Sequence, residues 1–405
     1  MKKLKMAVKR LLSKTGSLDL FIKRAYIWAT VFSYKLRYFL IQVKPKQIIF
    51  ESFQGKSASD SPYALYLQLQ KSLPNAKFIW VFANDNITDF QTLQKQANTH
   101  CVIRGTKAYF QAYASSQYWI VNCRLPYRLL ASSKQTVIQC WHGTPLKKLG
   151  MDIKVENHPT SSLKAMHFAY QWEGRRCDYF LSPSAYASSC FISSFGLDKN
   201  QIVELGYPRN DSLFRYKDDI EYQQAIKQKL GIEKDKKVIL YAPTFRDDDF
   251  SNGKHTAINR LDNDAFKEQF KDVHFLFRGH YFANVESKKD TGFLDVSDYP
   301  LINDLLLIAD EIITDYSSLF FDYLILERPM YFYMYDKDKY LNDIRGTYLN
   351  VDTDMPGPVV ERQEDLLHAM KEMNYTIEQQ NKFNQLYNLH EDGKSSFRIF
   401  NTLIK

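Results

Sequence analysis

Residues 141–146, Trp-His-Gly-Thr-Pro-Leu, directly follow a short apolar run at residues 136–140. Such a run in an α/β domain is typical of a buried strand, and reactive side chains gather where these strands end. The imidazole of His142 titrates near neutral pH, so it could take a proton from an attacking hydroxyl group. Gly143 would let a ligand approach the backbone, and the hydroxyl of Thr144 could bind a phosphate. A histidine with a purely structural role in a turn fits the spacing equally well.

A second segment of this kind lies at residues 275–280, Phe-Leu-Phe-Arg-Gly-His. The apolar run predicts a strand, and Arg278 and His280 stand two residues apart at its end. Since side chains alternate along an extended strand, both should point to the same face. A guanidinium and an imidazole that converge on one point suit a diphosphate. Pairing with a nearby carboxylate could explain Arg278 alone, but it explains the two residues together less well.

Hydroxyl side chains follow a third apolar run, Glu-Ile-Ile-Thr-Asp-Tyr-Ser-Ser at residues 311–318. A helical pattern begins at residue 319, so Ser317 and Ser318 would lie at the N-terminus of a helix. The free N–H groups and the helix dipole favour an anion there. Asp315 or Ser317 could also act as an ordinary helix cap, and that role is compatible with phosphate binding.

A fourth strand end, Tyr-Ala-Pro-Thr-Phe-Arg at residues 241–246, precedes three aspartates at residues 247–249. Consecutive acids more often form a solvated loop than a metal site, whose ligands come from several places, so we expect no metal. The sequence contains no G-x-G-x-x-G after the first strand, no P-loop motif and no G-x-S-x-G elbow. It therefore gives no support for a nicotinamide cofactor, a P-loop enzyme or an α/β-hydrolase. Five scattered cysteines without a C-x-x-C pair fit a reducing, cytosolic setting.

Short apolar runs alternate with helical patterns along most of the chain, which implies parallel sheets covered by helices on both faces. The alternation restarts after a polar stretch at residues 217–237. We expect an α/β fold with two Rossmann-like domains facing across a cleft, at residues 47–215 and 216–405, with ligands at the carboxyl ends of the strands. The predicted strands span residues 47–53, 77–82, 118–122, 136–140, 178–182, 202–205, 237–242, 273–278, 311–314 and 330–333, and a helix is predicted at residues 62–72.

Residues 1–46 differ from the rest of the chain in charge. They hold twelve Lys or Arg residues and one acid, so this segment carries +11 while the whole chain carries +8. The basic net charge therefore does not indicate a nucleic-acid-binding protein. The longest apolar stretch, residues 25–34, is far shorter than the roughly 20 residues of a membrane-spanning helix. Aromatic residues among many cations predict a helix on the surface of an anionic membrane, and packing on the protein body is the alternative.

Taken together, these segments resemble the CDP-glycerol glycerophosphotransferase family of teichoic acid and capsule synthesis. The matching segments follow the family's order from about residue 47 to residue 360, and jointly they are highly specific although none is so alone. They are residues 141–150, 206–211, 241–246, 278–280 and 314–318 with Asp322, and residues 60–62, 65–66 and 356–358 are also similar.

The resemblance implies a GT-B-like fold whose C-terminal domain binds most of the donor. His142 would be the base that acts on the acceptor hydroxyl. His280, with Arg278, would hold the diphosphate or assist the departure of CMP. The other residues that the resemblance places at the substrates are Gly143, Thr144, Pro145, Leu146, Arg209, Pro243, Thr244, Gly279, Ser317, Ser318 and Asp322.

The predicted reaction is a direct displacement without a cofactor. The acceptor hydroxyl, deprotonated by His142, attacks the β-phosphorus of CDP-glycerol or CDP-ribitol, and CMP leaves. The acceptor would be a lipid-linked saccharide or polyol phosphate, and the enzyme a peripheral protein on the cytoplasmic face of the cell membrane. Longer members of the family carry an additional N-terminal domain, so the short leader favours a primase-like or side-branch transferase over a processive polymerase.

Two other functions are compatible with the same residues. One is a two-domain glycosyltransferase that uses a CMP- or UDP-sugar, such as a sialyltransferase-like enzyme. The other is a non-catalytic scaffold tethered to the membrane, although intact His142, His280, Ser317 and Ser318 speak against a degenerate site. Residues 249–258 match no expected pattern and are predicted to form a loop, so the sequence does not choose the polyol.

Overall fold

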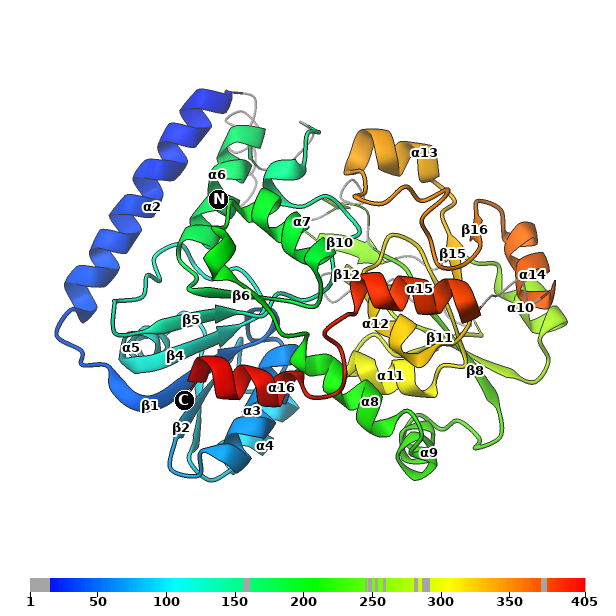
Figure 1. Cartoon of the computed structure of the whole chain (residues 1–405), viewed down its shortest axis with the longest axis horizontal. Helices are drawn as coiled ribbons and strands as arrows, with labels where there is room; N and C mark the ends of the chain where they lie inside the picture. The colour runs from blue at the N-terminus through cyan, green and yellow to red at the C-terminus, as the bar shows by residue number, and fades with distance from the viewer. Residues whose placement is uncertain are drawn as a thin grey trace. The chain divides into compact units, whose positions relative to one another are not determined.

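The structure is a computed structural model that describes residues 15–155, 161–244, 246, 250–251, 254–257, 260–279, 283–285, 292–372 and 377–404. The chain divides into two compact units, each with its own parallel β-sheet (Figure 1). Unit 1 comprises the described residues of Met1–His142, Leu149–Asp211 and His390–Lys405, and unit 2 those of Gly143–Lys148 and Ser212–Leu389. The chain thus passes between the units near residue 212, close to the predicted boundary at 215, and also near residues 143, 149 and 390.

Unit 1 is built on a seven-stranded sheet in which every neighbouring pair is parallel, in the order β3-β2-β1-β4-β5-β6-β7. The strand order reverses between β1 and β4, and open α/β sheets bind ligands outside the carboxyl ends of the strands at such a switch point. The strands are β1 (Lys44–Glu51), β2 (Lys77–Phe82), β3 (Thr99–Ile103), β4 (Ser116–Val121), β5 (Thr136–Gln139), β6 (Tyr179–Ser182) and β7 (Ile202–Glu204). The helices are α2 (Gly16–Tyr38), α3 (Asp60–Ser72), α4 (Thr88–Gln94), α5 (Lys107–Ser115), α6 (Leu163–Arg175), α7 (Ala185–Phe195) and α16 (Ser395–Ile399), with short helical turns η1 (Phe53–Gly55), η2 (Gly150–Asp152), η3 (Lys199–Gln201), η4 (Pro208–Asn210) and η7 (Phe400–Ile404).

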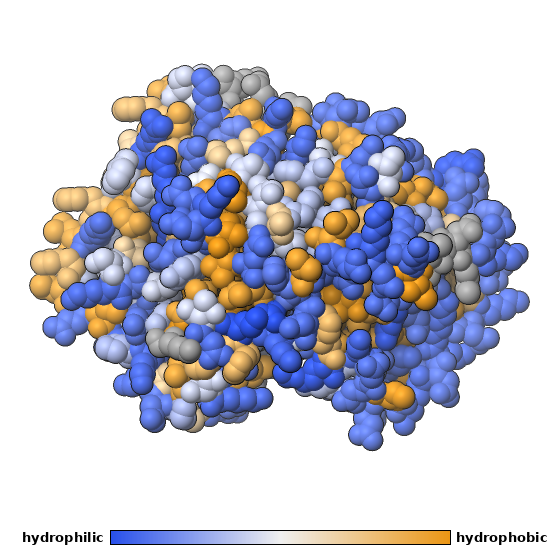
Figure 2. Space-filling model, viewed as in Figure 1, coloured by the Kyte–Doolittle hydropathy of each residue, from blue (hydrophilic) through white to orange (hydrophobic). Residues whose placement is uncertain are grey.

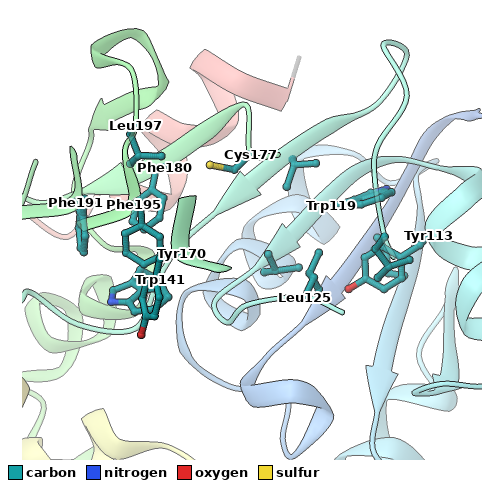
Figure 3. Packing of buried hydrophobic residues seen from close by; sticks show 14 of the residues in the cluster. Tyr113, Trp119, Leu125, Trp141, Tyr170, Cys177, Phe180, Phe191, Phe195 and Leu197 are labelled. Carbon is teal, nitrogen blue, oxygen red and sulfur yellow. The ribbon is translucent and has the colours of Figure 1, made fainter. Parts of the chain in front are cut away.

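Hydrophobic clusters cover both faces of the sheet of unit 1. Neighbouring residues of a strand point to opposite faces, so each strand contributes side chains to both clusters. Ile49 of β1 packs into one hydrophobic cluster together with Trp119 and Val137, whereas Ile48 and Phe50 pack into another. Figure 3 shows aromatic and aliphatic side chains of the first cluster packed beside the strands. Burial on both faces explains why these strands are continuous apolar runs in the sequence.

Unit 2 repeats this architecture with a six-stranded parallel sheet in the order β13-β11-β8-β14-β15-β16. Its switch point lies between β8 and β14. The strands of this sheet are β8 (Lys237–Ala242), β11 (Val273–Phe277), β13 (Leu294–Asp295), β14 (Glu311–Thr314), β15 (Met330–Tyr333) and β16 (Val359–Val360), and β9 (Phe250–Ser251), β10 (Lys254–Ala257) and β12 (Ala283–Val285) form a small second sheet. The helices are α9 (Ile220–Lys229), α10 (Asn263–Gln269), α11 (Ile302–Ile308), α12 (Leu319–Tyr323), α13 (Lys337–Lys339), α14 (Gln363–Glu372) and α15 (Ile377–Tyr387), with η5 (Leu324–Leu326) and η6 (Tyr340–Ile344), and α8 (Asp211–Tyr216) begins at the last residue of unit 1.

Helix α2 of unit 1 packs on α6 and leaves much of its apolar surface exposed. Ile27 and Val31 are buried against Trp172, and the backbone N and Oγ of Ser162 donate hydrogen bonds of 2.7 and 2.8 Å to Asp19. In Figure 2, hydrophobic side chains gather along the edge where Figure 1 shows α2. Its exposed large hydrophobic residues, with those of the turn that follows, are Leu18, Phe21, Ile22, Tyr26, Trp28, Phe32, Leu36, Phe39 and Leu40. None of the helices in the described ranges has the length and apolar character that crossing a bilayer requires.

The predicted α/β class and all ten predicted strands are confirmed, and β2, β8, β14 and β15 have the predicted ends. The predicted helix at residues 62–72 begins two residues earlier, as α3. Strand β3 was missed because it is an edge strand with an exposed His100 and no long apolar run. The prediction of a loop at residues 249–258 is wrong where β9 and β10 pair antiparallel, since so short a pairing leaves no alternating pattern. All five cysteines are free thiols.

Candidate active site

His142 follows the carboxyl end of β5 in unit 1, and its ring is held in one orientation. Its Nδ1 lies 2.7 Å from the carbonyl oxygen of Asn122, which can only accept a hydrogen bond. Nδ1 therefore carries the proton of the neutral ring, and Nε2 carries the lone pair. The ring stacks on Trp141, with ring centres 4.2 Å apart, and lies 6.1 Å from the ring centre of Phe53. This tautomer is the one that a general base acting through Nε2 requires.

The turn that presents His142 is strained. Trp141 has a φ of 50°, in the left-handed region that residues with side chains seldom adopt. Its backbone N donates a 3.0 Å hydrogen bond to Oε1 of Gln139, and its indole packs edge-on against Phe195 with ring centres 4.8 Å apart. Such strain persists only where the surrounding structure enforces it, and it is concentrated at functional sites.

Asn122 connects His142 to the switch point of the sheet. It directly follows β4, and its Oδ1 accepts a 2.9 Å hydrogen bond from the backbone N of Phe53, which lies just beyond β1. Because the carbonyl of Asn122 binds His142, the ends of β1, β4 and β5 are linked at one point. Asn122 is completely buried, and its Nδ2 has no hydrogen-bond partner among the described residues.

Residues 143–148, which belong to unit 2, pack against the turn after β14. A Cβ atom placed on Gly143 would lie 2.9 Å from Cβ of Ser318 and closer still to its Oγ. Only glycine permits this approach. Thr144, Pro145 and Leu146 are buried, and Oγ1 of Thr144 has no hydrogen-bond partner among the described residues.

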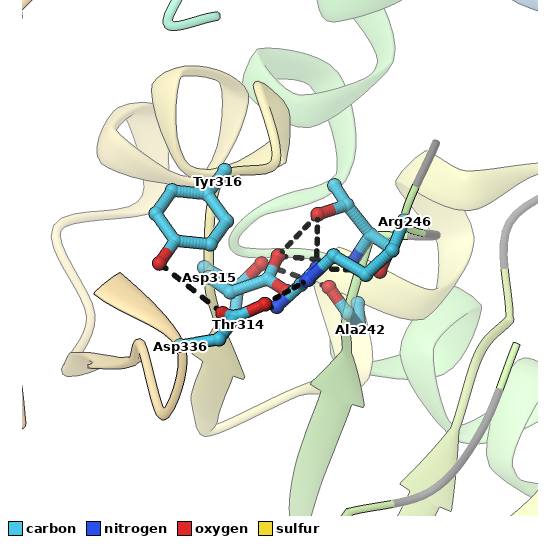
Figure 4. Close-up of polar contacts among 7 residues, drawn as sticks. Ala242, Arg246, Thr314, Asp315, Tyr316 and Asp336 are labelled. Atoms are coloured by element: carbon cyan, nitrogen blue, oxygen red, sulfur yellow. Dashed lines mark hydrogen bonds and ion pairs between the residues drawn. The ribbon is translucent and has the colours of Figure 1, made fainter. Parts of the chain in front are cut away.

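A buried charge cluster supports the switch point of unit 2 (Figure 4). Oδ1 of Asp315 accepts hydrogen bonds from the backbone N and Oγ1 of Thr244, at 2.9 and 2.8 Å. Arg246 donates to Oδ2 of Asp315 at 2.8 Å and binds both carboxylate oxygens of Asp336, at 2.7 and 2.9 Å. Burial alone would lower the pKa of Arg246, but the two carboxylates outweigh it and the pKa is raised. Its charge is thus neutralised inside the protein, so Arg246 positions the strand ends rather than binding a phosphate.

Arg278 and Gly279 lie just beyond β11, as predicted. Arg278 donates to the carbonyl oxygens of Val296 and Tyr299, at 3.1 and 2.7 Å, and the backbone N of Gly279 donates to Oγ of Ser297 at 2.8 Å. Burial lowers the pKa of Arg278 to about 10, so the side chain stays cationic at neutral pH. His280 lies outside the described residues, and so do the three aspartates at 247–249.

Ser317 and Ser318 precede α12, in the predicted place. Oγ of Ser317 accepts a 3.3 Å hydrogen bond from the backbone N of Leu319, the first residue of α12, and Ser318 is the N-cap residue of this helix. Both serines are half-buried, whereas Asp322 on the helix is buried. Together with Pro243, which directly follows β8, these residues surround the β8–β14 switch point.

Arg209 lies in unit 1 and is buried. Its NH1 is 3.7 Å from Oδ1 of Asp60, and its guanidinium stacks over the ring of Tyr207 at 4.1 Å from the ring centre. The described part of the chain holds no group of three or more His, Cys, Asp or Glu side chains placed to bind a metal ion.

The structure therefore gathers the predicted residues at two switch points: His142 at that of unit 1, and Gly143, Pro243, Thr244, Ser317 and Ser318 at that of unit 2. Nucleotide-binding α/β folds bind their ligands at this edge of the sheet, beyond the carboxyl ends of the strands.

A model of the family described as CDP-Glycerol:Poly(glycerophosphate) glycerophosphotransferase matches residues 32–405. The chain belongs to this family. The resemblance inferred from the motifs is thereby confirmed.

Two relatives show how the chain compares with whole proteins of the family. It is 41% identical to the teichoic acid poly(glycerol phosphate) polymerase of Staphylococcus epidermidis, over 87% of this chain and 50% of that protein. It is 39% identical to the teichoic acid glycerol-phosphate transferase of Staphylococcus aureus, over 88% of this chain and 92% of that protein. The chain thus spans about half of the first relative and most of the second. Relatives named for glycerol phosphate are 35–41% identical to it, and those named for ribitol phosphate 29–32%.

The solved structure of the wall teichoic acid polymerase TagF superposes on this chain with a TM-score of 0.81 and 36% identity, over 95% of this chain and 97% of that one. A histidine-to-asparagine variant of TagF was also solved after a soak with CDPG. The family fold is therefore the GT-B-like α/β fold that the resemblance implied.

Sequence reasoning missed the residues that hold the predicted ones in place: Phe53, Asn122, Asp336 and Tyr340. Asn122 acts through its backbone carbonyl, and Asp336 meets Arg246 across 90 residues of chain. Tyr340 stacks on Tyr316 with ring centres 3.6 Å apart, beside the guanidinium of Arg246. Strand-end polar residues were a usable signal for Asn122, which directly follows β4.

Proposed function

We propose that this protein transfers glycerol phosphate from CDP-glycerol to a hydroxyl group of a membrane-linked acceptor in teichoic acid or capsule biosynthesis, releasing CMP. Family membership supports the reaction class, and the higher identity to relatives named for glycerol phosphate favours that polyol over ribitol phosphate. The observation that carries the proposal is the orientation of His142, whose protonated Nδ1 faces Asn122 and whose Nε2 is the basic nitrogen.

In the proposed mechanism His142 takes the proton of the acceptor hydroxyl at Nε2. The acceptor oxygen then forms a bond to the β-phosphorus, and the bond from that phosphorus to the oxygen shared with the α-phosphate breaks. CMP leaves with that oxygen. Little covalent chemistry is left to the protein, so positioning and neutralisation of the phosphate charge supply most of the rate.

The donor phosphates are proposed to bind at the β8–β14 switch point of unit 2. Arg278, just beyond the neighbouring strand β11, supplies the cation, and Ser317 and Ser318 supply hydroxyl groups. Gly143 allows the segment at residues 143–148 to pack closely against Ser318. Because the hydroxyl of Thr244 is bound to Asp315, Thr244 and Pro243 contribute mainly by shaping the strand end. His280 and Asp322 remain predicted contacts of the donor.

A donor panel tests the proposed function. With a lipid-linked acceptor, the protein is expected to release CMP from CDP-glycerol faster than from CDP-ribitol, and not from CMP-sialic acid. The product should gain the mass of glycerol phosphate units, as measured by mass spectrometry. Release from CMP-sialic acid or transfer from a UDP-sugar instead would identify a glycosyltransferase, and failure to bind any cytidine nucleotide would support the scaffold.

We also propose that the protein is peripheral on the cytoplasmic face of the membrane and attaches through α2. Phe21 and Phe32 on this helix are 68% and 70% exposed, beside several cations of the same segment. Replacing both with serine is expected to reduce sedimentation with vesicles of anionic lipid, because aromatic side chains anchor interfacial helices. Ile220→Ser on α9, which removes an equally exposed apolar side chain, should leave sedimentation unchanged. Equal sedimentation of the double variant and the wild type would show that α2 is not the anchor.

A further inference from the structure

Unit 1 contains a cavity of about 350 Å³ that none of the predicted site residues line. It opens at the carboxyl ends of three neighbouring strands: Gln54 and Lys56 follow β1, Ala83 follows β2 and Arg104 follows β3. The lining residues are Gln54, Lys56, Ala83, Arg104, Gly105, Tyr109, Phe110 and Pro126. This edge of the sheet is where open α/β folds bind ligands, so the cavity is placed for function.

The guanidinium of Arg104 is fixed at one end. Its Nε donates a 2.9 Å hydrogen bond to Glu51, the last residue of β1, which is 2% exposed. Glu51 also accepts hydrogen bonds from the hydroxyls of Tyr113 and Tyr109, at 2.6 and 3.3 Å. Burial raises the pKa of both tyrosines, so they stay neutral donors. The carboxylate is thus fully engaged, and it orients the arginine.

The other end of Arg104 remains available. Its side chain is 29% exposed, and neither terminal nitrogen has a hydrogen-bond acceptor among the described residues. A guanidinium that is anchored through Nε presents its two terminal NH2 groups as a fork, which matches the oxygens of a phosphate. Lys56, an exposed residue on the same cavity, adds a second positive charge.

The loop that carries Gln54 and Lys56 is held in an unusual conformation. Phe53, Gln54 and Gly55 have φ values of 45°, 58° and 85°, all left-handed. Gly55 packs closely on the end of β2, because a Cβ atom placed on it would lie 2.7 Å from the backbone N of Ala83. Phe53 is also the aromatic neighbour of His142. The cavity therefore begins one residue from a side chain that contacts the proposed base.

A second cavity of about 330 Å³ continues the first towards α2. The two share Gly105, Phe110 and Pro126, and the second is also lined by Tyr26, Thr30, Tyr127 and Arg128. Arg128 lies over the ring of Phe110, 5.3 Å from its centre. A groove lined by three cations, Lys56, Arg104 and Arg128, thus leads from Tyr26 of α2 to the loop beside Phe53, the aromatic neighbour of His142.

We propose that this groove binds the acceptor, and that Arg104 and Lys56 hold a phosphate group next to the hydroxyl that reacts. The inference rests on the proposed function and names the acceptor subsite of the same enzyme. The remainder of the acceptor passes Arg128 and leaves the groove beside α2, where a lipid-linked chain would meet the membrane. Phosphate is the favoured ligand because the two NH2 groups of a guanidinium can bind two phosphate oxygens at once, and an ammonium group adds a further positive charge and donor.

The test compares Arg104→Gln and Lys56→Gln in a steady-state assay of CMP release. Each variant is expected to raise the KM for an acceptor ending in glycerol phosphate by about 10- to 100-fold. This is the loss of affinity expected when one charge-assisted hydrogen bond, worth about 1.5–3 kcal/mol, is removed. The KM for CDP-glycerol, and the KM for a matching acceptor without phosphate, should not change. Lys107→Gln, which removes an exposed cation of α5 that does not line the groove, is the matched control and should behave as the wild type.

Two results of the kinetic test would overturn the inference. The first is an unchanged KM for the acceptor in both variants. Lys56→Gln decides this even where Arg104→Gln fails to fold, since it leaves the Glu51 cluster intact. The second is a loss of binding to anionic vesicles with an unchanged KM for a soluble acceptor, which would assign the groove to lipid headgroups.

The proposed function can fail separately, if the wild type releases no CMP from CDP-glycerol. Calorimetry with a glycerol phosphate oligomer then tests the groove. Equal affinities of the wild type and Arg104→Gln for this oligomer would be a third result that overturns the inference.

Discussion

Replacing His142 with alanine is expected to lower the rate of CMP release roughly 10²- to 10⁴-fold, the usual contribution of a general base. The variant loses the only proposed group that removes the proton from the acceptor hydroxyl, while the groups proposed to hold the donor remain. The affinity for CDP-glycerol, measured by calorimetry, should therefore change little. The loss should appear in kcat, because the base acts in the chemical step rather than in binding.

A second histidine of unit 1 provides a control for His142. Nε2 of His167 lies 2.9 Å from the carbonyl oxygen of Ile153, so His167→Ala also removes a half-buried imidazole that is bonded to the backbone. Its turnover should match that of the wild type. If His142→Ala also keeps wild-type turnover, or if it loses donor affinity in proportion to rate, the assignment of His142 as the base is wrong.

Replacing Arg246 with methionine is expected to destabilise unit 2 by about 3–5 kcal/mol, the usual cost of removing one partner from a buried ion pair. Asp315 and Asp336 would be left in the interior without their shared cation. Thr244 at the end of β8 would also lose the hydrogen bonds that Arg246 donates to its carbonyl oxygen and Oγ1, so donor affinity should fall as well. Chemical denaturation measures the first effect and calorimetry with CDP-glycerol the second.

Arg260 offers the matched control for Arg246. Its guanidinium also lies over the ring of Tyr335, 5.6 Å from the centre, but the residue is exposed. Arg260→Met should therefore cost much less stability. Arg246→Lys should be intermediate, because lysine keeps the charge but cannot bind both oxygens of Asp336. Equal unfolding free energies for Arg246→Met and Arg260→Met would show that the cluster does not hold the switch point together.

The sequence predicted ten of the strands and the residues at their ends, because burial on both faces of a parallel sheet leaves apolar runs that stop where polar residues begin. The short or edge strands β3, β9, β10, β12, β13 and β16 leave no such run. It did not predict which strands lie side by side. The adjacency of β8 and β14 joins Thr244 to Asp315 across 71 residues, and no local pattern encodes it. For the same reason Arg246 could not be recognised as a residue whose charge is already neutralised.

The site was predictable to the extent that chemistry follows residue type. An imidazole, a glycine and hydroxyl groups at strand ends are visible in the sequence, and His142, Gly143, Ser317 and Ser318 lie where this reasoning places them. The tautomer of His142 depends on a backbone carbonyl, which every residue possesses. Contacts of that kind carry no compositional signal, so they appear only with the fold.

The exposed apolar face of α2 has a consequence for handling the protein in dilute buffer. Without a lipid surface to cover them, side chains such as Phe21, Phe32 and Leu36 would pack against any other apolar surface, including the same helix on a neighbouring molecule. Self-association would then rise with protein concentration and fall with mild detergent. Kinetic measurements on the purified chain are therefore best interpreted alongside its oligomeric state at each concentration used.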